Sequence, residues 1–244
     1  MSPVNGVFDR TGTVQRPSYR LLLKEVWSLI SYRPAAPDPR PLRSGGGHVV
    51  LIIPAFLTAD AVTKSLREFL ERCGYRAFGW DLGINWGPTD RLLTELRRRL
   101  RELRELEGGP ITVIGVSLGG LLARDLACDH PEDIRVVITL ASPFRLPTAS
   151  TIEPLFHLCA RFYSARIEPE RISKPLSVPA FAIYTRDDGI VAWRSCMSED
   201  DHCEAVEVSG AHVTICRNPD ALRLLATRMA KPASAKRARA ASGS

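Results

Sequence analysis

The sequence predicts an α/β protein built on one reduced, mostly parallel, doubly wound sheet of about six strands. Short β-branched apolar segments alternate with helical segments from His48 onward, and Gly and Pro residues separate them. Of the 244 residues, 45% are hydrophobic and 25% charged, which is the composition of an ordinary globular domain. Parallel strands joined by helices require right-handed crossovers, so we expect helices on both faces of the sheet.

A separate N-terminal region is expected over residues 1–47. Residues 18–31 predict one amphipathic helix, because Leu22, Val26 and Leu29 recur at helical spacing. Such a helix packs against a domain or lies on a membrane surface, and the small number of basic residues in it favours packing. The Pro-rich and then Gly-rich stretch that runs to residue 47 predicts a linker.

The main domain is expected over residues 48–230. The predicted strands are 49–53, 76–80, 111–116, 134–140, 180–184 and 205–208. The predicted helices are 59–72, 88–106, 118–128 and 218–229.

One long connection interrupts this alternation between the fourth and fifth strands. Within it, residues 145–178 predict a short helical lid, since the sheet already has helices for both faces. Its apolar residues at helical spacing are Leu155, Phe156, Leu158 and Phe162. The alternative is a helix that only pads the flank of the domain. Residues 231–244 are basic and rich in Ala and Ser, which predicts a disordered tail.

The net charge of +6 does not indicate a nucleic-acid partner. Arginines between positions 97 and 104 are interleaved with glutamates, as on a solvated helix face, and further basic residues belong to the tail. No signal segment is visible in residues 1–13, and no apolar run is long enough to cross a membrane. We therefore expect a soluble protein of the cytoplasm without an integral membrane span.

The six cysteines show no C-x-x-C motif and predict mostly free thiols in a reducing compartment. Cys196 and Cys203 are close enough in the sequence for a disulfide, which sequence alone cannot decide. The spacing of His202, Cys203 and Cys216 matches no standard zinc pattern, so no metal site is predicted.

A nucleophile motif lies where the third strand meets its helix. The segment Gly115-Val116-Ser117-Leu118-Gly119 fits G-x-S-x-G, in which glycines permit a sharp strand-to-helix turn that exposes the serine. The backbone N–H of Leu118 begins the helix and would face an oxyanion formed at Ser117. The alternative is a simple Gly-rich turn.

A nucleophilic serine needs a base, and the base needs an acid to orient it. Asp188 follows the fifth strand and His212 follows the sixth, so both belong to the same sheet edge as Ser117. We prefer Asp188 to Asp187 because Gly189 permits the tight turn that presents the carboxylate. The remaining histidines, at positions 48, 130, 157 and 202, fit this edge less well.

The loop after the first strand should supply the second oxyanion donor, for which the N–H of Phe56 is the candidate. Asn85 either ties the next loop to this one or simply forms a turn. Trp86 and Phe144 either line an acyl pocket or serve only in packing.

From His48 to Met229 the chain resembles the α/β-hydrolase superfamily. It is similar in particular to bacterial esterase/lipase-like members with a Pro-Gly-Phe oxyanion loop and an Asp-Gly-Val-Val acid turn. Here the loop reads Pro54-Ala55-Phe56 and the turn reads Asp188-Gly189-Ile190-Val191. Ala55 replaces the glycine of those relatives, which matters if this position requires a positive φ.

The sequence therefore predicts a serine hydrolase that cleaves carboxylic, acyl or lipid-like esters through an acyl-enzyme intermediate. Its triad would be Ser117, Asp188 and His212, and it would need no cofactor and no metal. One alternative is an acyltransferase that uses the same triad. Another is a non-catalytic lipid-binding or scaffold protein on the same fold, for which all three triad residues would have no use.

Overall fold

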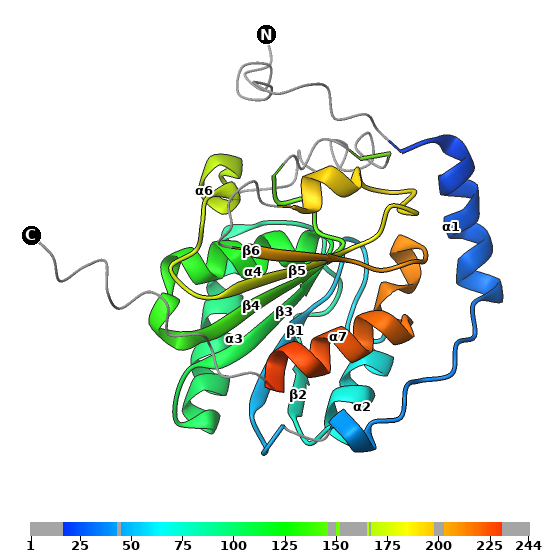
Figure 1. The fold of residues 1–244 in the computed structure, drawn as a ribbon. Helices are drawn as coiled ribbons and strands as arrows, with labels where there is room; N and C mark the ends of the chain where they lie inside the picture. Colours follow the sequence, from blue (N-terminus) through cyan, green and yellow to red (C-terminus); the bar gives the residue numbers. More distant parts are fainter. Residues whose placement is uncertain are drawn as a thin grey trace, which may run out of the picture.

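The computed structural model describes residues 17–42, 45–145, 150–151, 165, 167–197 and 203–230. Six strands form the sheet: β1 (Val49–Ile53), β2 (Arg76–Gly79), β3 (Ile111–Val116), β4 (Ile134–Leu140), β5 (Ala180–Tyr184) and β6 (Cys203–Glu207). They lie in the order β2-β1-β3-β4-β5-β6, and every neighbouring pair is parallel (Figure 1). The predicted six-stranded parallel sheet is confirmed.

Helices cover both faces of this sheet. The α-helices are α1 (Tyr19–Ser31), α2 (Lys64–Arg72), α3 (Asp90–Glu107), α4 (Leu118–Asp129), α6 (Pro169–Ser173) and α7 (Pro219–Ala230). Short 3₁₀ helices are η1 (Arg40–Leu42), η2 (Pro131–Asp133), η3 (Trp193–Cys196) and η4 (His212–Arg217). Helices α2 and α7 pack on one face, and α3 and α4 pack on the other.

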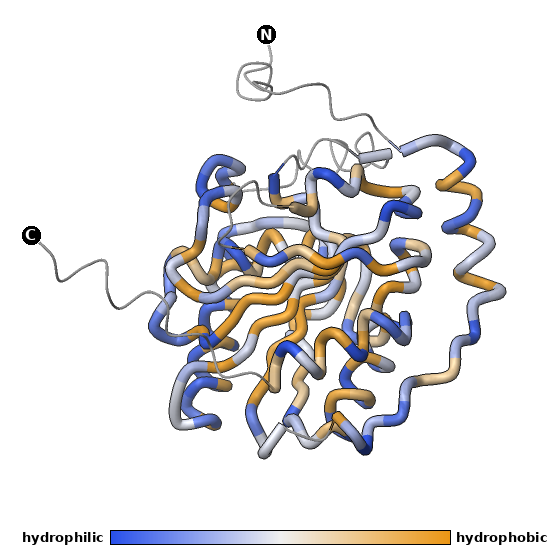
Figure 2. The backbone as a smooth tube through the Cα atoms, in the orientation of Figure 1, coloured by the Kyte–Doolittle hydropathy of each residue, from blue (hydrophilic) through white to orange (hydrophobic). Residues whose placement is uncertain are grey.

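The central strands are mostly apolar because both faces of the sheet are covered (Figure 2). In β1, Val50 and Ile52 point into the core beneath α2 and α7. The alternate residues Val49, Leu51 and Ile53 point into the core beneath α3 and α4. This alternation fixes the register of the strand, since a shift by one residue would exchange the two sets.

Helix α3 is the solvated, charge-paired helix that the sequence predicts. It begins where the Thr89 hydroxyl accepts a hydrogen bond from the N–H of Leu92, and it ends at Gly108, whose φ is 77°. On its exposed side Arg98 pairs with both Glu95 and Glu102. Arg98 therefore belongs to an ion-pair network on the helix surface.

Three predicted starts were wrong by two residues or more, and one of them is that of α3, which begins at Asp90 and not at residue 88. Helix α2 begins at Lys64 and not at residue 59, because residues 59–64 form successive turns whose amides bond to carbonyls three residues earlier. The carboxylate of Asp60 is used there to accept from the amides of Trp80 and Asp81, which fixes the turns to the end of β2. Strand β6 begins at Cys203, two residues before the predicted start.

Helix α1 packs on the domain as expected, but the predicted packing face was wrong. Val26 and Leu29, which define that face in the sequence, are 55% and 52% exposed. The residue of α1 that is buried is Glu25, at 2% exposure. Figure 1 shows α1 beside the domain, apart from the helices that cover the sheet. The helix is held by a polar contact, which hydrophobic periodicity does not detect.

The connection between β4 and β5 is described only in part. Its last helix, α6, is fixed to α4, because Arg124 donates to the carbonyls of Ile172 and Lys174. The predicted lid residues Leu155, Phe156, Leu158 and Phe162 lie outside the described residues, as does the tail at 231–244. Within the described part of the chain, no helix has the length and apolar character needed to cross a bilayer.

Candidate active site

The parallel sheet brings three polar residues to its carboxyl edge. Ser117 follows β3 directly, Asp188 follows β5, and His212 begins η4 after β6. All three are buried, with exposures of 7%, 2% and 6%. Loops after parallel strands converge at this edge, which is where open α/β sheets bind ligands.

Ser117 lies on a strained turn between β3 and α4. Its backbone angles are φ 51° and ψ −117°, a conformation that non-glycine residues rarely adopt. The flanking glycines allow this turn: a Cβ on Gly115 would lie 2.3 Å from the carbonyl oxygen of Gly119. A Cβ on Gly119 would lie 2.3 Å from the carbonyl oxygen of Ile53. The G-x-S-x-G spacing is therefore required by close backbone contacts.

Asp188 and His212 form a buried pair. The Nδ1 atom of His212 lies 2.7 Å from Oδ2 of Asp188. The other carboxylate oxygen, Oδ1, accepts from the amides of Ile190 and Val191, each at 2.8 Å. The turn thus fixes the carboxylate and orients the imidazole, leaving Nε2 as the ring nitrogen available for proton transfer.

The adjacent aspartate has a different environment. Asp187 is half exposed and pairs with Lys24 of α1 at 3.0 Å. Asp188 is the aspartate that faces His212, so the structure distinguishes two residues that are next to each other in the sequence. A surface pair of this kind contributes about 0–1 kcal/mol to stability.

The charge near His212 affects its protonation. Burial on its own lowers the pKa of His212, but the charge and hydrogen bond of Asp188, with the charge of Glu25, outweigh burial and hold the pKa above its ordinary value. The protonated form of His212, the imidazolium, is therefore stabilised in this environment.

The loop after β1 lies next to the start of α4. Phe56 packs in one apolar cluster with Leu118 and Leu121. Ala55 has no positive φ, so the substitution of Ala for Gly does not strain this loop; Leu57 has the positive value, φ 57°. The amides of Phe56 and Leu118 therefore belong to segments that meet beside Ser117.

Asn85 ties the loop after β2 to this segment. The side chain is fully buried, and its Nδ2 donates to the carbonyl of Pro54 at 2.8 Å. Two backbone hydrogen bonds, between Asn85 and residues Leu57 and Thr58, join the same loops. Its Oδ1 also accepts from Gly87, so Asn85 forms a turn and ties the loops.

Comparison with solved structures places this architecture among known enzymes. One structure, described under the two metagenome-derived lipolytic enzymes LipS and LipT, matches at 16% identity over 75% of this chain and 92% of its own, with a TM-score of 0.56. Est1E from Butyrivibrio proteoclasticus, bound to ferulic acid, matches at 14% identity over 80% and 90%, also with 0.56. MGS-MChE2, an alpha/beta hydrolase from a lagoon-sediment metagenome, matches at 13% identity over 76% and 91%, with 0.53.

The chain has the α/β-hydrolase fold. A scan of family models and a search of curated proteins find no match to the sequence. The similarity is therefore one of fold, and the chemistry of the site has to be inferred from the residues of this chain.

The two aromatic residues that the sequence offered for an acyl pocket differ in exposure. Phe144 is fully buried and stacks against the guanidinium of Arg124 at 4.1 Å, so it serves in packing. Trp86 is 59% exposed on the surface of its loop.

Glu25 is a residue of this site that sequence reasoning missed. Its carboxylate accepts from the backbone amides of Gly189, His212 and Val213. A glutamate in an amphipathic helix is normally read as solvent-exposed. The signal that could have found it is that Glu25 is the single acidic residue in the helix Tyr19–Ser31 and lies near its centre.

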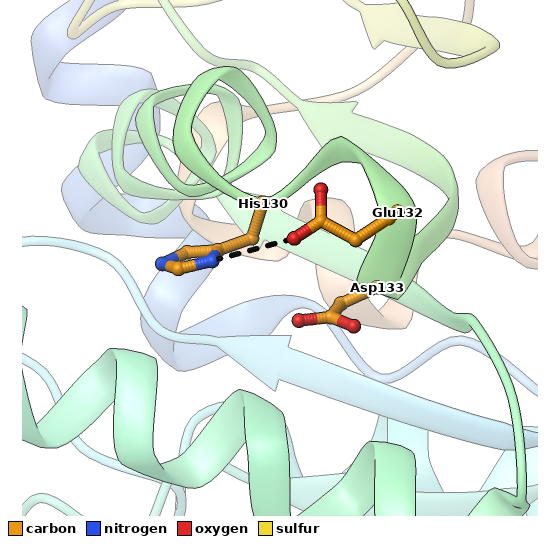
Figure 3. Close-up of side chains that lie close together, drawn as sticks. All are labelled: His130, Glu132 and Asp133. Atoms are coloured by element: carbon orange, nitrogen blue, oxygen red, sulfur yellow. Dashed lines mark ion pairs between the residues drawn. The ribbon is translucent and has the colours of Figure 1, made fainter.

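The other histidines within the described part lie away from this edge. His48 precedes β1 and bonds to Glu107 and Thr112, at the opposite edge of the sheet. His130 lies after α4 beside Glu132 and Asp133 (Figure 3). In the described ranges, the nitrogen and oxygen atoms of these three side chains that could bind a metal lie within 4.8 Å of one another. Asp133, however, is already paired with Arg104.

The described cysteines are free thiols, at positions 73, 128, 196, 203 and 216. Cys196 and Cys203 therefore do not form the disulfide that the sequence left open. His202, one of the residues considered for a metal, lies outside the described residues.

Proposed function

We propose that this chain is a serine hydrolase that cleaves carboxylic esters, with Ser117 as nucleophile, His212 as base and Asp188 as the acid. The main support is the buried Asp188–His212 pair at the same sheet edge as a serine on a strained strand-to-helix turn. A nucleophile, a base and an orienting carboxylate in this chain order are the arrangement used for acyl transfer.

In the proposed acylation step, Ser117 Oγ attacks the ester carbonyl while Nε2 of His212 accepts the hydroxyl proton. Asp188 holds the Nδ1–H and stabilises the imidazolium. The amides of Phe56 and Leu118 donate to the oxyanion. When the tetrahedral intermediate collapses, the carbon–oxygen bond to the alcohol breaks and His212 returns the proton to the departing alcohol.

Deacylation repeats these steps with water. His212 removes a proton from the water, which attacks the acyl carbonyl, and the proton then returns to Ser117 as the acid leaves. Each group is used in both halves, so no cofactor or metal is needed. The named neighbours, lipolytic enzymes and an esterase bound to ferulic acid, support an acyl or lipid-like ester as substrate. The free thiols of the described cysteines support a reducing, cytoplasmic compartment.

The proposal is tested by incubating the purified protein with p-nitrophenyl esters of increasing acyl length and, separately, with a fluorophosphonate probe. We expect hydrolysis of the esters and covalent labelling at Ser117. An added alcohol that captures the acyl group faster than water does would indicate an acyltransferase. Absence of both labelling and turnover would favour a non-catalytic binding protein.

The raised pKa of His212 predicts the pH dependence of the reaction. As a general base His212 must be neutral, so kcat/KM should fall as the pH drops through the pKa of this residue in the free enzyme. We expect the midpoint of the acid limb above the ordinary histidine value of 6.5. A profile measured between about pH 5 and pH 9 checks this, and a midpoint below 6.5 would contradict it.

A further inference from the structure

One side chain from the N-terminal helix contacts both loops of the proposed triad. Oε1 of Glu25 accepts from the amides of Gly189 and His212, both at 2.8 Å, and Oε2 accepts from Val213 at 2.9 Å. Gly189 follows Asp188 directly, and His212 is the proposed base itself. A single carboxylate therefore bonds to the backbone beside the acid and to the backbone of the base.

We propose that Glu25 is a positioning residue, which fixes the Asp188 turn and the His212 loop relative to each other. This inference rests on the proposed function of those two residues. Glu25 is 2% exposed, so its hydrogen bonds form away from water, and its carboxylate acts on His212 as a negative charge. Charge-assisted hydrogen bonds of this kind are shorter and about twice as strong as neutral ones.

The shape of the contact supports this role. A Cβ on Gly189 would lie 2.4 Å from the carbonyl oxygen of Leu21, so the backbone of α1 rests directly on the acid turn. The opposite side of that turn is also held, because the Thr151 hydroxyl donates to the carbonyl of Gly189 at 2.9 Å. Helix α1 is thus one wall of the turn that presents Asp188.

Glu25 also adds negative charge near the base. The charged and titratable groups that act on His212 are Asp188 from the β5 loop and Glu25 from α1, and both favour the imidazolium. Cys196 lies near Asp188 from η3, and burial raises its thiol pKa well above the ordinary value, so it stays neutral. Removing the Glu25 charge should therefore lower the pKa of His212.

A neutral hydrogen bond between the same two loops provides a matched control. The hydroxyl of Thr185, at the end of β5, donates to the carbonyl of Gly210 at 2.6 Å. Thr185→Val removes this contact, and also the hydrogen bond that the hydroxyl accepts from the amide of Asp187 at 3.1 Å, at nearly constant shape, and it leaves every charge in place. Glu25→Gln removes a charge and one acceptor, also at nearly constant shape.

The experiment measures two quantities on wild type, Glu25→Gln and Thr185→Val. The first is the His212 pKa by NMR titration of the imidazole, and the second is kcat and KM for a short p-nitrophenyl ester. We expect Glu25→Gln to lower the His212 pKa and to lower kcat by about 10²-fold with little change in KM, since small misplacements of reacting groups have effects of that size. Thr185→Val should leave the His212 pKa unchanged.

The outcomes separate the two proposals. If Glu25→Gln is folded by circular dichroism and keeps both the wild-type His212 pKa and wild-type kcat, the positioning role is overturned while the esterase proposal stands. If the wild type hydrolyses no ester but Glu25→Gln still lowers the His212 pKa, the proposed function fails and the contact is upheld. If Glu25→Gln does not fold, Glu25→Asp replaces it in the experiment. This variant keeps the charge, but its side chain is one methylene shorter, so its oxygens lie further from the three amides. An unchanged kcat and His212 pKa in that variant would overturn the role.

Discussion

Ser117→Ala is expected to reduce kcat for ester hydrolysis by on the order of 10⁶-fold, and to abolish labelling by a fluorophosphonate. The hydroxyl is the proposed nucleophile, so its removal leaves no atom at position 117 to form the acyl-enzyme. Residual turnover should come from the oxyanion donors and substrate binding alone, roughly 10³–10⁴-fold over the reaction in water. Initial rates with p-nitrophenyl butyrate, together with mass spectrometry of the probe adduct, measure both effects.

The matched control is Ser209→Ala, an exposed serine in the loop that leads to His212. It makes the same chemical change near the same edge and should retain wild-type kcat. Both variants should unfold at temperatures close to that of the wild type, because each removes only one hydroxyl. A Ser117→Ala protein that keeps more than a few per cent of the wild-type rate would show that another residue is the nucleophile.

Asp188→Asn is expected to lower kcat by about 10⁴-fold, since an amide would hold His212 in the wrong tautomer. The adjacent Asp187 provides a control with the same chemical substitution. Asp187→Asn removes only the half-exposed pair with Lys24, so kcat should change little and stability should fall by no more than about 1 kcal/mol. Steady-state kinetics and thermal denaturation of the two variants measure the contrast.

Equal losses of kcat in the two aspartate variants would remove Asp188 from its proposed role. A second measurement makes the comparison sharper: the NMR signal of the His212 Nδ1 proton should be altered by Asp188→Asn and unaffected by Asp187→Asn. This follows from the 2.7 Å contact between His212 and Asp188.

The sheet could be predicted closely because its strands are buried on both faces. The bounds of β1, β3, β4 and β5 agree with those expected from the sequence, since short, mostly apolar segments between turn residues leave little choice of length. The start of α2 could not be predicted in the same way. The residues before Lys64 have helical periodicity, but the tertiary bonds of Asp60 to the end of β2 favour turns there.

Some residues of the candidate site could likewise be predicted from the sequence, and others could not. Ser117, Asp188 and His212 have local signals, namely a glycine-flanked turn or a position after a strand, and strand order brings them to one edge. Asn85 could be assigned either of two roles from the sequence, and the structure gives it both. Glu25 has no signal that points to its partners beyond being the single acidic residue of its helix, because those partners are backbone amides more than 160 positions away. Contacts with amides leave no pattern of side chains to recognise.

The position of Glu25 in the chain has a consequence for protein synthesis. Helix α1 leaves the ribosome before any strand of the sheet, whereas the amides that bond to Glu25 are 164, 187 and 188 residues further along. At translation rates of roughly 5–20 residues per second, the last of these follows Glu25 by roughly 10–40 s. During that interval the nascent helix has no acid turn or histidine loop to dock on. The three bonds to Glu25 can all form only after residue 213 has been translated.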